Sequence, residues 1–229
     1  PRDGHLQQAL NIFKYIKHNV TTGWIIFDPL DYEINWVPIR PDELHPKERA
    51  QVMKDLYPDA EDPLPSNMPE PRGKHVSINV FVDSDHAGNV LTRRSHTGIM
   101  IFLNMAPIQW YSKKQNTIES STFGTEFIAL KIAIELTESL QYKLRMMGVP
   151  LIEPARVMCD NQSGVISGSF PESTLKKKHC SIAYHKVREA VAAGKILIYY
   201  ENTASNIADL FTKVLTVNKR WLLIQGVLS

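Results

Sequence analysis

Proline places the strongest restriction on what this chain can fold into. Nine of its fourteen prolines lie between Asp28 and Pro71. Proline lacks a backbone donor and disfavours helical geometry in the residue before it, so neither a continuous sheet nor a long helix is expected there. We predict an extended connection over residues 21–75, interrupted by one short helix near Pro46–Leu56.

The segment before this connection has a helical pattern. Residues 5–18 read HLQQALNIFKYIKH, and their apolar residues recur at steps of three and four. A helix this short needs a partner for its apolar face. The chain begins with Pro1 rather than Met, so we expect it to be an internal piece of a longer polypeptide.

Regular structure is predicted from Val76 onward. Three strand patterns separated by short turns are typical of an antiparallel meander. Gly148 and Gly194 then end two longer helical patterns. The expected strands are 76–82, 97–104, 106–112, 155–159 and 195–200. The expected helices are 120–147, a short one after 160, 175–193, and 205–213 with Ser205 as its cap. This order predicts an α/β fold.

The distribution of charge and the number of cysteines indicate what class of protein this is. Residues 76–229 hold 17 Lys+Arg against 12 Asp+Glu, and residues 1–75 hold 9 against 12. The basic part fits a polyanionic partner, although a solvated basic face is the commoner meaning. Two cysteines, Cys159 and Cys180, with no C-x-x-C pair, indicate reduced thiols in an intracellular protein. No apolar run approaches the ~18 residues that a membrane span needs, so no membrane partner is expected.

Four acidic residues lie in or beside apolar segments, where an unpaired charge is costly. They are Asp83, Glu126, Asp160 and Asp209. No lysine or arginine is their immediate neighbour, and a divalent cation such as Mg²⁺ would compensate them. Each acid also has an ordinary structural explanation, as a turn residue, an early-helix acid or a solvated helix residue. The set as a whole favours a metal site.

The stretch DSDHAG invites comparison with a calcium-binding loop. It matches the first part of an EF-hand loop, but position five is Ala87 and position twelve is Arg94 instead of glutamate. The segment before it is strand-like rather than helical. We therefore reject a calcium loop.

Several separate blocks of the sequence resemble one known family. They are FVDSDHAG, TRRSHTGIMIFL, IQWYSKKQNTIESSTFGTEFIAL, MCDNQSGV and NIADLFTK. In this order they resemble the ribonuclease H domain of copia-type LTR retrotransposon polyproteins, from about Val80 to Lys213. The segment GHLQQALNIFKYIKH is similar to the end of the family's reverse transcriptase region. The polymerase's YxDD-type motif is absent from the sequence, so the chain should not polymerise by itself.

The resemblance implies a domain division and a fold. Residues 1–20 would be the remnant of the reverse transcriptase region, and residues 21–75 the proline-rich connection. Residues 76–215 would form the ribonuclease H-like domain, and residues 216–229 a tail. The implied fold is a mixed five-stranded sheet, with three antiparallel strands followed by two parallel additions, flanked by helices.

The resemblance also implies an activity, which is hydrolysis of the RNA strand of RNA–DNA hybrids. Asp83, Glu126, Asp160 and Asp209 match the family's four metal-binding acids, and Asp85 is a neighbour of this set. Two Mg²⁺ ions, with Mn²⁺ as a substitute, would be the cofactors. Departures from the family wording include Gly124, which replaces a glutamate, and Ser181, which replaces an aspartate. No residue matches the flexible active-site histidine of cellular ribonucleases H, and His179 and His185 are expected on the helix 175–193 in structural roles.

Exposed basic and amide side chains near these blocks are candidates for binding the hybrid. They are Arg93, Arg94, Lys113, Lys114, Asn161 and Gln162, with the run 176–178 as a further basic group. Phosphate contacts would position the duplex without reading its sequence. Trp110 is expected in the core rather than as a stacking platform.

Two other interpretations stay open at this point. One is a catalytically inactive hybrid-binding or scaffolding remnant of a retrotransposon. The other is a different nuclease of the same fold, such as an integrase core, but the zinc-binding His/Cys region expected with that interpretation is missing from the sequence. The expected partners are the RNA–DNA hybrid and the remainder of the polyprotein. The resemblance implies an intracellular location, in cytoplasmic virus-like particles or in the nucleus.

Overall fold

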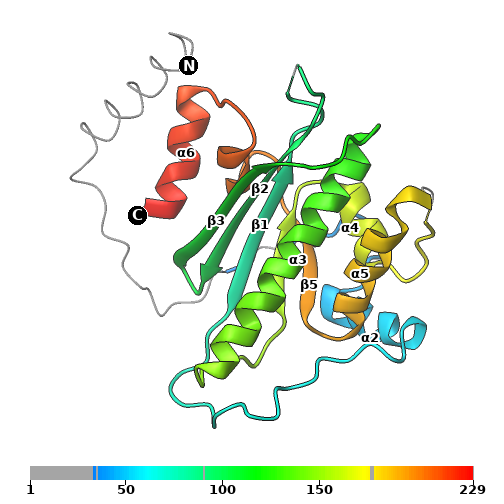
Figure 1. Ribbon diagram of the computed structural model, residues 1–229, viewed down its shortest axis with the longest axis vertical. Helices are drawn as coiled ribbons and strands as arrows, with labels where there is room; N and C mark the ends of the chain where they lie inside the picture. The colour runs from blue at the N-terminus through cyan, green and yellow to red at the C-terminus, as the bar shows by residue number, and fades with distance from the viewer. Residues whose placement is uncertain (1–32, 35, 90, 176–177, 229) are drawn as a thin grey trace.

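The structure is a computed structural model that describes residues 33–228 apart from 35, 90 and 176–177. The helix predicted over residues 5–18 lies outside the described residues. In the described part, a central sheet is flanked by helices on both faces (Figure 1). No helix described here combines the length and apolarity that crossing a membrane would need.

The sheet has five strands in the order β3-β2-β1-β4-β5. They are β1 (Ile78–Ser84), β2 (His96–Leu103), β3 (Ala106–Lys114), β4 (Ala155–Cys159) and β5 (Ile196–Tyr200). β1, β2 and β3 pair antiparallel, whereas β4 pairs parallel to β1 and β5 parallel to β4. This is the mixed sheet that the sequence predicts, with three antiparallel strands and two parallel additions.

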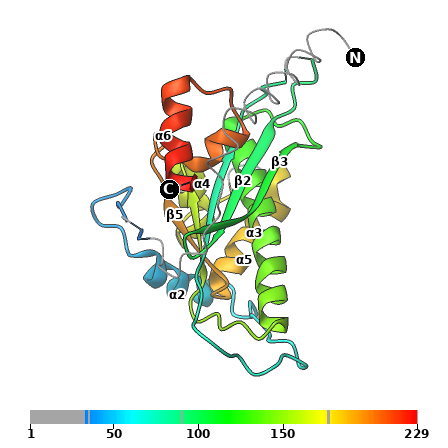
Figure 2. The same ribbon diagram turned by 90° about the vertical axis from the view of Figure 1, so that its left-hand side faces the viewer.

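Helices cover the two faces unequally. The helical elements are α2 (Pro46–Leu56), α3 (Thr122–Met146), α4 (Gln162–Ser169), α5 (Ser181–Ala192) and α6 (Val217–Leu228), with 3₁₀ turns η1 (Lys178–Cys180) and η2 (Ile207–Phe211). α3, α4 and α5 lie on one side of the sheet, and α6 lies on the other (Figure 2). The sheet is therefore the middle layer of the described part.

The alternation of side chains along β1 builds two cores. Val80 and Val82 face the cluster that includes Phe127 and Leu130 of α3. Phe81 faces the opposite cluster, which includes Ile207 and Ala208 of η2. Successive strand residues point to opposite faces, so Asp83 is on the same face as Phe81. The strand predicted to stop at Asp83 continues through Ser84 and buries both residues.

The proline-rich connection contains the predicted short helix, and this helix is packed into the core. α2 begins with a capping box in which the His45 side chain and Glu48 satisfy backbone donors. Met53 is fully buried, and Arg49, only 2% exposed, pairs with Glu43 at 2.9 Å. The Arg49 guanidinium also lies over the Phe170 ring. At least this part of the connection belongs to the same packed unit as the sheet.

Three local predictions differ from the structure. The helix predicted over 175–193 begins only at Ser181, after η1. Before these elements, the Ser173 carbonyl accepts a hydrogen bond from the Tyr184 hydroxyl at 2.6 Å. Residues 217–228, expected only as a tail, form α6. Trp110, expected in the core, is 64% exposed on β3.

We predict that Met53→Ala lowers the free energy of unfolding by about 2–4 kcal/mol, because it leaves a cavity in a buried site. The matched control is Val52→Ala on the same helix, whose side chain is 41% exposed and whose truncation should cost less than about 0.5 kcal/mol. Urea unfolding followed by circular dichroism measures both variants. Equal, small effects would show that α2 is not part of the cooperative unit.

Candidate metal centre

Asp83 is placed by the strand pairing of β1. Its backbone pairs with Gly98 of β2, and its side chain is buried. Gly98 matters for this placement, because a Cβ there would lie 2.7 Å from the carbonyl oxygen of Ala208. The glycine thus allows η2 to approach the sheet closely, directly beside Asp83.

Asp160 follows the last residue of β4. Val82 of β1 pairs with Cys159 of β4, so the carboxyl ends of these parallel strands lie next to each other. The chain leaves β1 toward β2 and leaves β4 toward β5, on opposite sides. Such a switch point, outside the carboxyl ends of the strands, is where open α/β sheets bind ligands.

Glu126 comes from the second turn of α3. The Ser121 side chain caps this helix by accepting a hydrogen bond from the Gly124 amide at 3.2 Å. Glu126 is 5% exposed, and within the described part of the chain its Oε2 atom has no hydrogen-bond partner. A buried carboxylate oxygen without a partner is costly, and a bound cation would satisfy it.

Asp209 lies in η2, and the type of helix predicted for this segment is wrong. The predicted α-helix with Ser205 as its cap is a five-residue 3₁₀ turn whose cap is Asn206. The buried Asn206 side chain donates to the Val82 carbonyl at 3.0 Å and accepts from the Ala208 amide at 3.1 Å. This tie to β1 fixes the turn against the strand that carries Asp83.

The four acids predicted from the sequence gather in one place. One oxygen each of Asp83, Asp160 and Asp209 lie within 4.8 Å of one another. Glu126, Cys159 and Asp160 form an adjoining group by the same measure, so Asp160 belongs to both. Asp85 instead accepts a hydrogen bond from the His96 amide and holds the following turn.

Burial shifts the pKa values of three of these carboxyls upward. Desolvation, with the neighbouring charges of Asp83 and Asp160, raises the pKa of Glu126 to about 9. Desolvation also raises the pKa of Asp83 to about 6, although Thr212 and Lys213 oppose it. The pKa of Asp160 is raised chiefly by its burial. Without a counter-ion, the cluster resists holding its full negative charge.

Asp209 behaves differently because two lysines face it. Burial alone would raise its pKa, but hydrogen bonds from Lys213 and Lys219 outweigh burial and hold the pKa below its ordinary value. The Lys213 Nζ atom lies 2.7 Å from Asp209 Oδ1 and 3.2 Å from Asp83 Oδ2. Neither lysine was a candidate from the sequence. The spacing of four residues between Asp209 and Lys213 could have indicated the first, but no local pattern indicates the second.

The donor set fits divalent metal ions. Carboxylate oxygens are the ligands that Mg²⁺ and Mn²⁺ prefer, and the Glu126 Oε2 atom adjoins a group of acids that repel one another. Clustered carboxylates with raised pKa values are typical of a site built around a cation.

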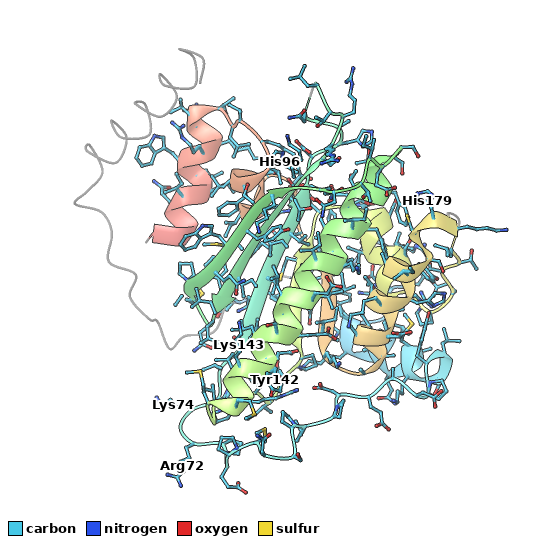
Figure 3. All side chains as sticks on the ribbon, viewed as in Figure 1. Arg72, Lys74, His96, Tyr142, Lys143 and His179 are labelled. Carbon is cyan, nitrogen blue, oxygen red and sulfur yellow. The ribbon has the colours of Figure 1, made fainter. Side chains whose placement is uncertain are left out.

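The predicted nucleic-acid-binding residues are spread around this centre. β3 carries Lys113 and Lys114, which pair with Thr97 and His96 of β2 and are exposed. These positions are at the same end of the sheet as Asp83, and Figure 3 labels His96 at that end, away from Lys143 and Tyr142 on α3. Arg93 and Arg94 are exposed in the turn before β2. Their binding role stays a prediction.

The amides Asn161 and Gln162 follow Asp160. Asn161 caps α4 by accepting from the Gly164 amide at 2.9 Å, so its side-chain oxygen is already used. Gln162 is exposed. Within the run 176–178, only Lys178 is described, and it is exposed on η1.

The two histidines considered have other partners. His185 lies on α5, as predicted, and its ring contacts the Tyr57 hydroxyl at 2.9 Å. His179 lies on η1, and its Nε2 atom is 3.0 Å from Glu119. Glu119 occupies the space beside Gly124, where a Cβ would come 2.6 Å from its Oε2 atom. Gly124 therefore leaves the start of α3 intact and makes room for this contact between His179 and Glu119.

The mixed sheet and this acidic centre are the two features that the family resemblance in the sequence implies. The chain is 27% identical over 145 residues to a retrovirus-related Pol polyprotein from transposon RE2 of Arabidopsis thaliana, covering 63% of this chain and 10% of that protein. It is 31% identical over 147 residues to the corresponding polyprotein from transposon TNT 1-94 of Nicotiana tabacum, covering 64% and 11%. The predicted resemblance to copia-type Pol polyproteins is confirmed. The chain spans about a tenth of the length of these relatives.

Solved structures with a similar fold include ribonucleases H. The structure of LC11-RNase H1 in complex with an RNA/DNA hybrid covers 59% of this chain and 94% of its own, with 15% identity and a TM-score of 0.48. No family model matches the chain. The predicted mixed five-stranded sheet flanked by helices is confirmed.

The raised carboxyl pKa values predict how stability changes with pH in metal-free protein. The pKa of Glu126 is about 9 in the folded state against an ordinary 4.5, so between these values the folded state keeps a proton that the unfolded state releases. The free energy of unfolding should therefore fall as pH rises through this range. Asp83 contributes with the same sign, between 3.8 and about 6.

Thermal unfolding in EDTA at several pH values between about 5 and 8 measures this slope. Glu126→Gln should flatten it, because the amide does not titrate, while Glu135→Gln on the exposed part of the same helix should not. Mg²⁺ should raise the melting temperature more at the higher pH. A slope that is unchanged in Glu126→Gln would contradict the placement of Glu126.

Proposed function

We propose that this chain hydrolyses the RNA strand of RNA–DNA hybrids, using two divalent ions held by its four clustered acids. The observation that carries the proposal is the gathering of Asp83, Asp160 and Asp209 within 4.8 Å, with Glu126 adjoining through Asp160. These residues come from β1, the end of β4, η2 and α3, so chain proximity alone does not explain their meeting.

Each acid has a distinct position in the proposed mechanism. By the family resemblance Asp83 would be the central ligand, and its carboxyl contacts Thr212 and Lys213. Glu126 and Asp160 would hold one Mg²⁺ with it, and Asp209 would hold the second more loosely. Ions bound there, with Mn²⁺ as a substitute, would activate the attacking water and stabilise the leaving oxygen.

Substrate choice would depend on the surface around the centre. RNA differs from DNA by the 2′-hydroxyls that it displays in the wide minor groove, and a hybrid-specific nuclease must contact them. Asn161 and Gln162, which follow Asp160 in the chain, would contact sugars or base edges. Arg93, Arg94, Lys113 and Lys114 would contact phosphates, which fixes the position of the duplex without reading its sequence.

The same proposal assigns the wider context. The relatives are Pol polyproteins, so the chain would work as one part of such a polyprotein, with the rest of that polyprotein as its partner. Its place of action would then be intracellular, in virus-like particles or in the nucleus. The geometry of the four acids is the same whatever the location of the protein in the cell.

Cleavage of a labelled RNA–DNA hybrid tests the activity directly. The parent protein should cut the RNA strand with Mg²⁺ or Mn²⁺ and leave duplex DNA intact, and EDTA should stop the reaction. Asp83→Asn should lower the cleavage rate by about a hundredfold or more, as expected when a group that stabilises transition-state charge is removed. Asp55→Asn, an exposed acid on α2, is the matched control and should cut normally. Tight hybrid binding without cleavage by the parent protein would favour an inactive scaffold instead.

The basic residues can be tested by binding rather than cleavage. Lys113→Gln with Lys114→Gln should weaken hybrid binding in Ca²⁺ or without metal. The salt dependence should fall as well, because a protein that neutralises fewer phosphates releases fewer counterions on binding. Lys143→Gln, at the other end of α3, should leave both quantities unchanged. Fluorescence anisotropy at several salt concentrations measures them, and an equal salt slope in all three proteins would remove these lysines from the interface.

A further inference from the structure

Two lysine side chains reach the acidic centre from its Asp209 side. We propose that Lys213 and Lys219 are positioning residues whose ammonium groups hold Asp209 and Asp83 in place and compete with the divalent ion at Asp209. The inference rests on the proposed function, because it assumes that the four acids take up metal ions. It deepens that function by assigning unequal cation affinities to the two ends of the centre.

The contacts of Lys213 place a fixed positive charge between two carboxylates. Its Nζ atom lies 2.7 Å from Asp209 Oδ1 and 3.3 Å from Asp83 Oδ1. These are the two residues that would share an ion at this end of the centre. A divalent cation that enters there must displace this ammonium group or bind both carboxylates more weakly.

Lys219 adds a second positive charge on the other oxygen of the same acid. Its ammonium group donates to Asp209 Oδ2 and to the Thr203 carbonyl, the latter at 3.1 Å. Both oxygens of Asp209 are therefore engaged by lysines. Asp209 and Asp83 are almost fully buried, so solvent and salt screen these attractions little.

At the other end of the centre no described lysine contacts the acids, and the charge of Lys213 acts on Asp160 and Glu126 only without an ion pair. Among the residues that the structure describes, no lysine or arginine forms an ion pair with Glu126 or Asp160. Glu126 instead keeps an oxygen without a hydrogen-bond partner in the described part of the chain. The direct lysine contacts are thus unequal, because lysine ammonium groups contact Asp209 and Asp83, whereas Glu126 and Asp160 feel the Lys213 charge without an ion pair.

Both lysines can leave without disturbing the core. Their side chains are 39% and 30% exposed, so each ammonium group can swing into water while its stem stays in place. Lys219 belongs to α6, which lies beside η2 on the face away from α3 (Figures 1 and 2). Buried Leu223 packs this helix onto the protein. A helix outside the region of family resemblance therefore acts on the proposed metal centre.

Metal binding without substrate tests the inference. Titration calorimetry with Mg²⁺ and with Mn²⁺ would compare the parent protein with Lys213→Gln, Lys219→Gln and the double variant. Asp209→Asn identifies the binding event that depends on Asp209, and Glu126→Gln identifies the other. Lys143→Gln, on the distal end of α3, is the matched control.

The Asp209-dependent event should become about five- to tenfold tighter in each single variant, because removing a cation a few ångströms away removes its repulsion. The Glu126-dependent event should change less, and Lys143→Gln should change neither. In EDTA, the two variants should melt at lower temperature than the parent protein, because Asp209 is then short of a counter-charge. Lys213→Arg keeps the charge and should retain the parent's stability.

Unchanged or weaker binding at Asp209 in both Gln variants would overturn the inference. If Lys213→Gln does not fold, Lys219→Gln tests the same claim, since its lysine is on the surface helix α6. The outcome is separable from that of the proposed function. If the lysine variants bind metal ions more tightly at Asp209 but the parent protein cuts no hybrid, only the proposed activity is refuted. If the parent protein cuts the hybrid and the lysine variants bind metal ions with unchanged affinity, only the role of the lysines is refuted.

Discussion

Burial of negative charge at the carboxyl ends of β1 and β4 dictates most of the other features of this protein. Asp83 and Asp209 are almost fully buried and Glu126 is 5% exposed, which would be prohibitive for isolated charges. The protein offsets this cost in two ways. Protonation is favoured at Glu126, whose pKa rises to about 9, and lysine ammonium groups neutralise Asp209. A divalent cation would relieve both ends.

The neutral polar contacts around the centre hold these charges in position. Asn206 ties η2 to the Val82 carbonyl, and Gly98 lets that turn approach the sheet. Ser121 and Asn161 cap the two helices that flank the acids. Each contact is short-range and specific, so the carboxyl groups approach one another because the backbone around them is fixed. Such preorganisation would suit the proposed function, in which the centre would place ions relative to a phosphate.

The proline-rich connection and the last helix extend this unit beyond the core of the fold. α2 buries Met53 and Arg49 against α5 and Phe170, and α6 brings Lys219 to Asp209. α2, which precedes the region of family resemblance, thus contributes buried packing, and α6, which follows it, contributes a positive charge beside Asp209. The described part of the chain is therefore one packed unit that includes α2 and α6.

The order of the elements and the identity of the acids could be predicted from the amino-acid sequence. Apolar alternation is a local property, so β4 was predicted at its observed bounds, and the blocks that contain Asp83, Glu126, Asp160 and Asp209 were recognisable by type and order. Local pattern failed where a distant contact sets the conformation. Asn206 replaces Ser205 as the cap of η2, and the Asn206 side chain also donates to the Val82 carbonyl on the distant strand β1.

The balance of charge in the centre, by contrast, follows from folding. Lys213 and Lys219 compensate Asp209, whereas no described lysine or arginine forms an ion pair with Glu126. Glu126 and Asp209 belong to the same four-acid pattern in the sequence, and nothing in that pattern separates a compensated acid from an uncompensated one. The interaction energy of two charges depends on the distance between them in space, and not on their spacing along the chain.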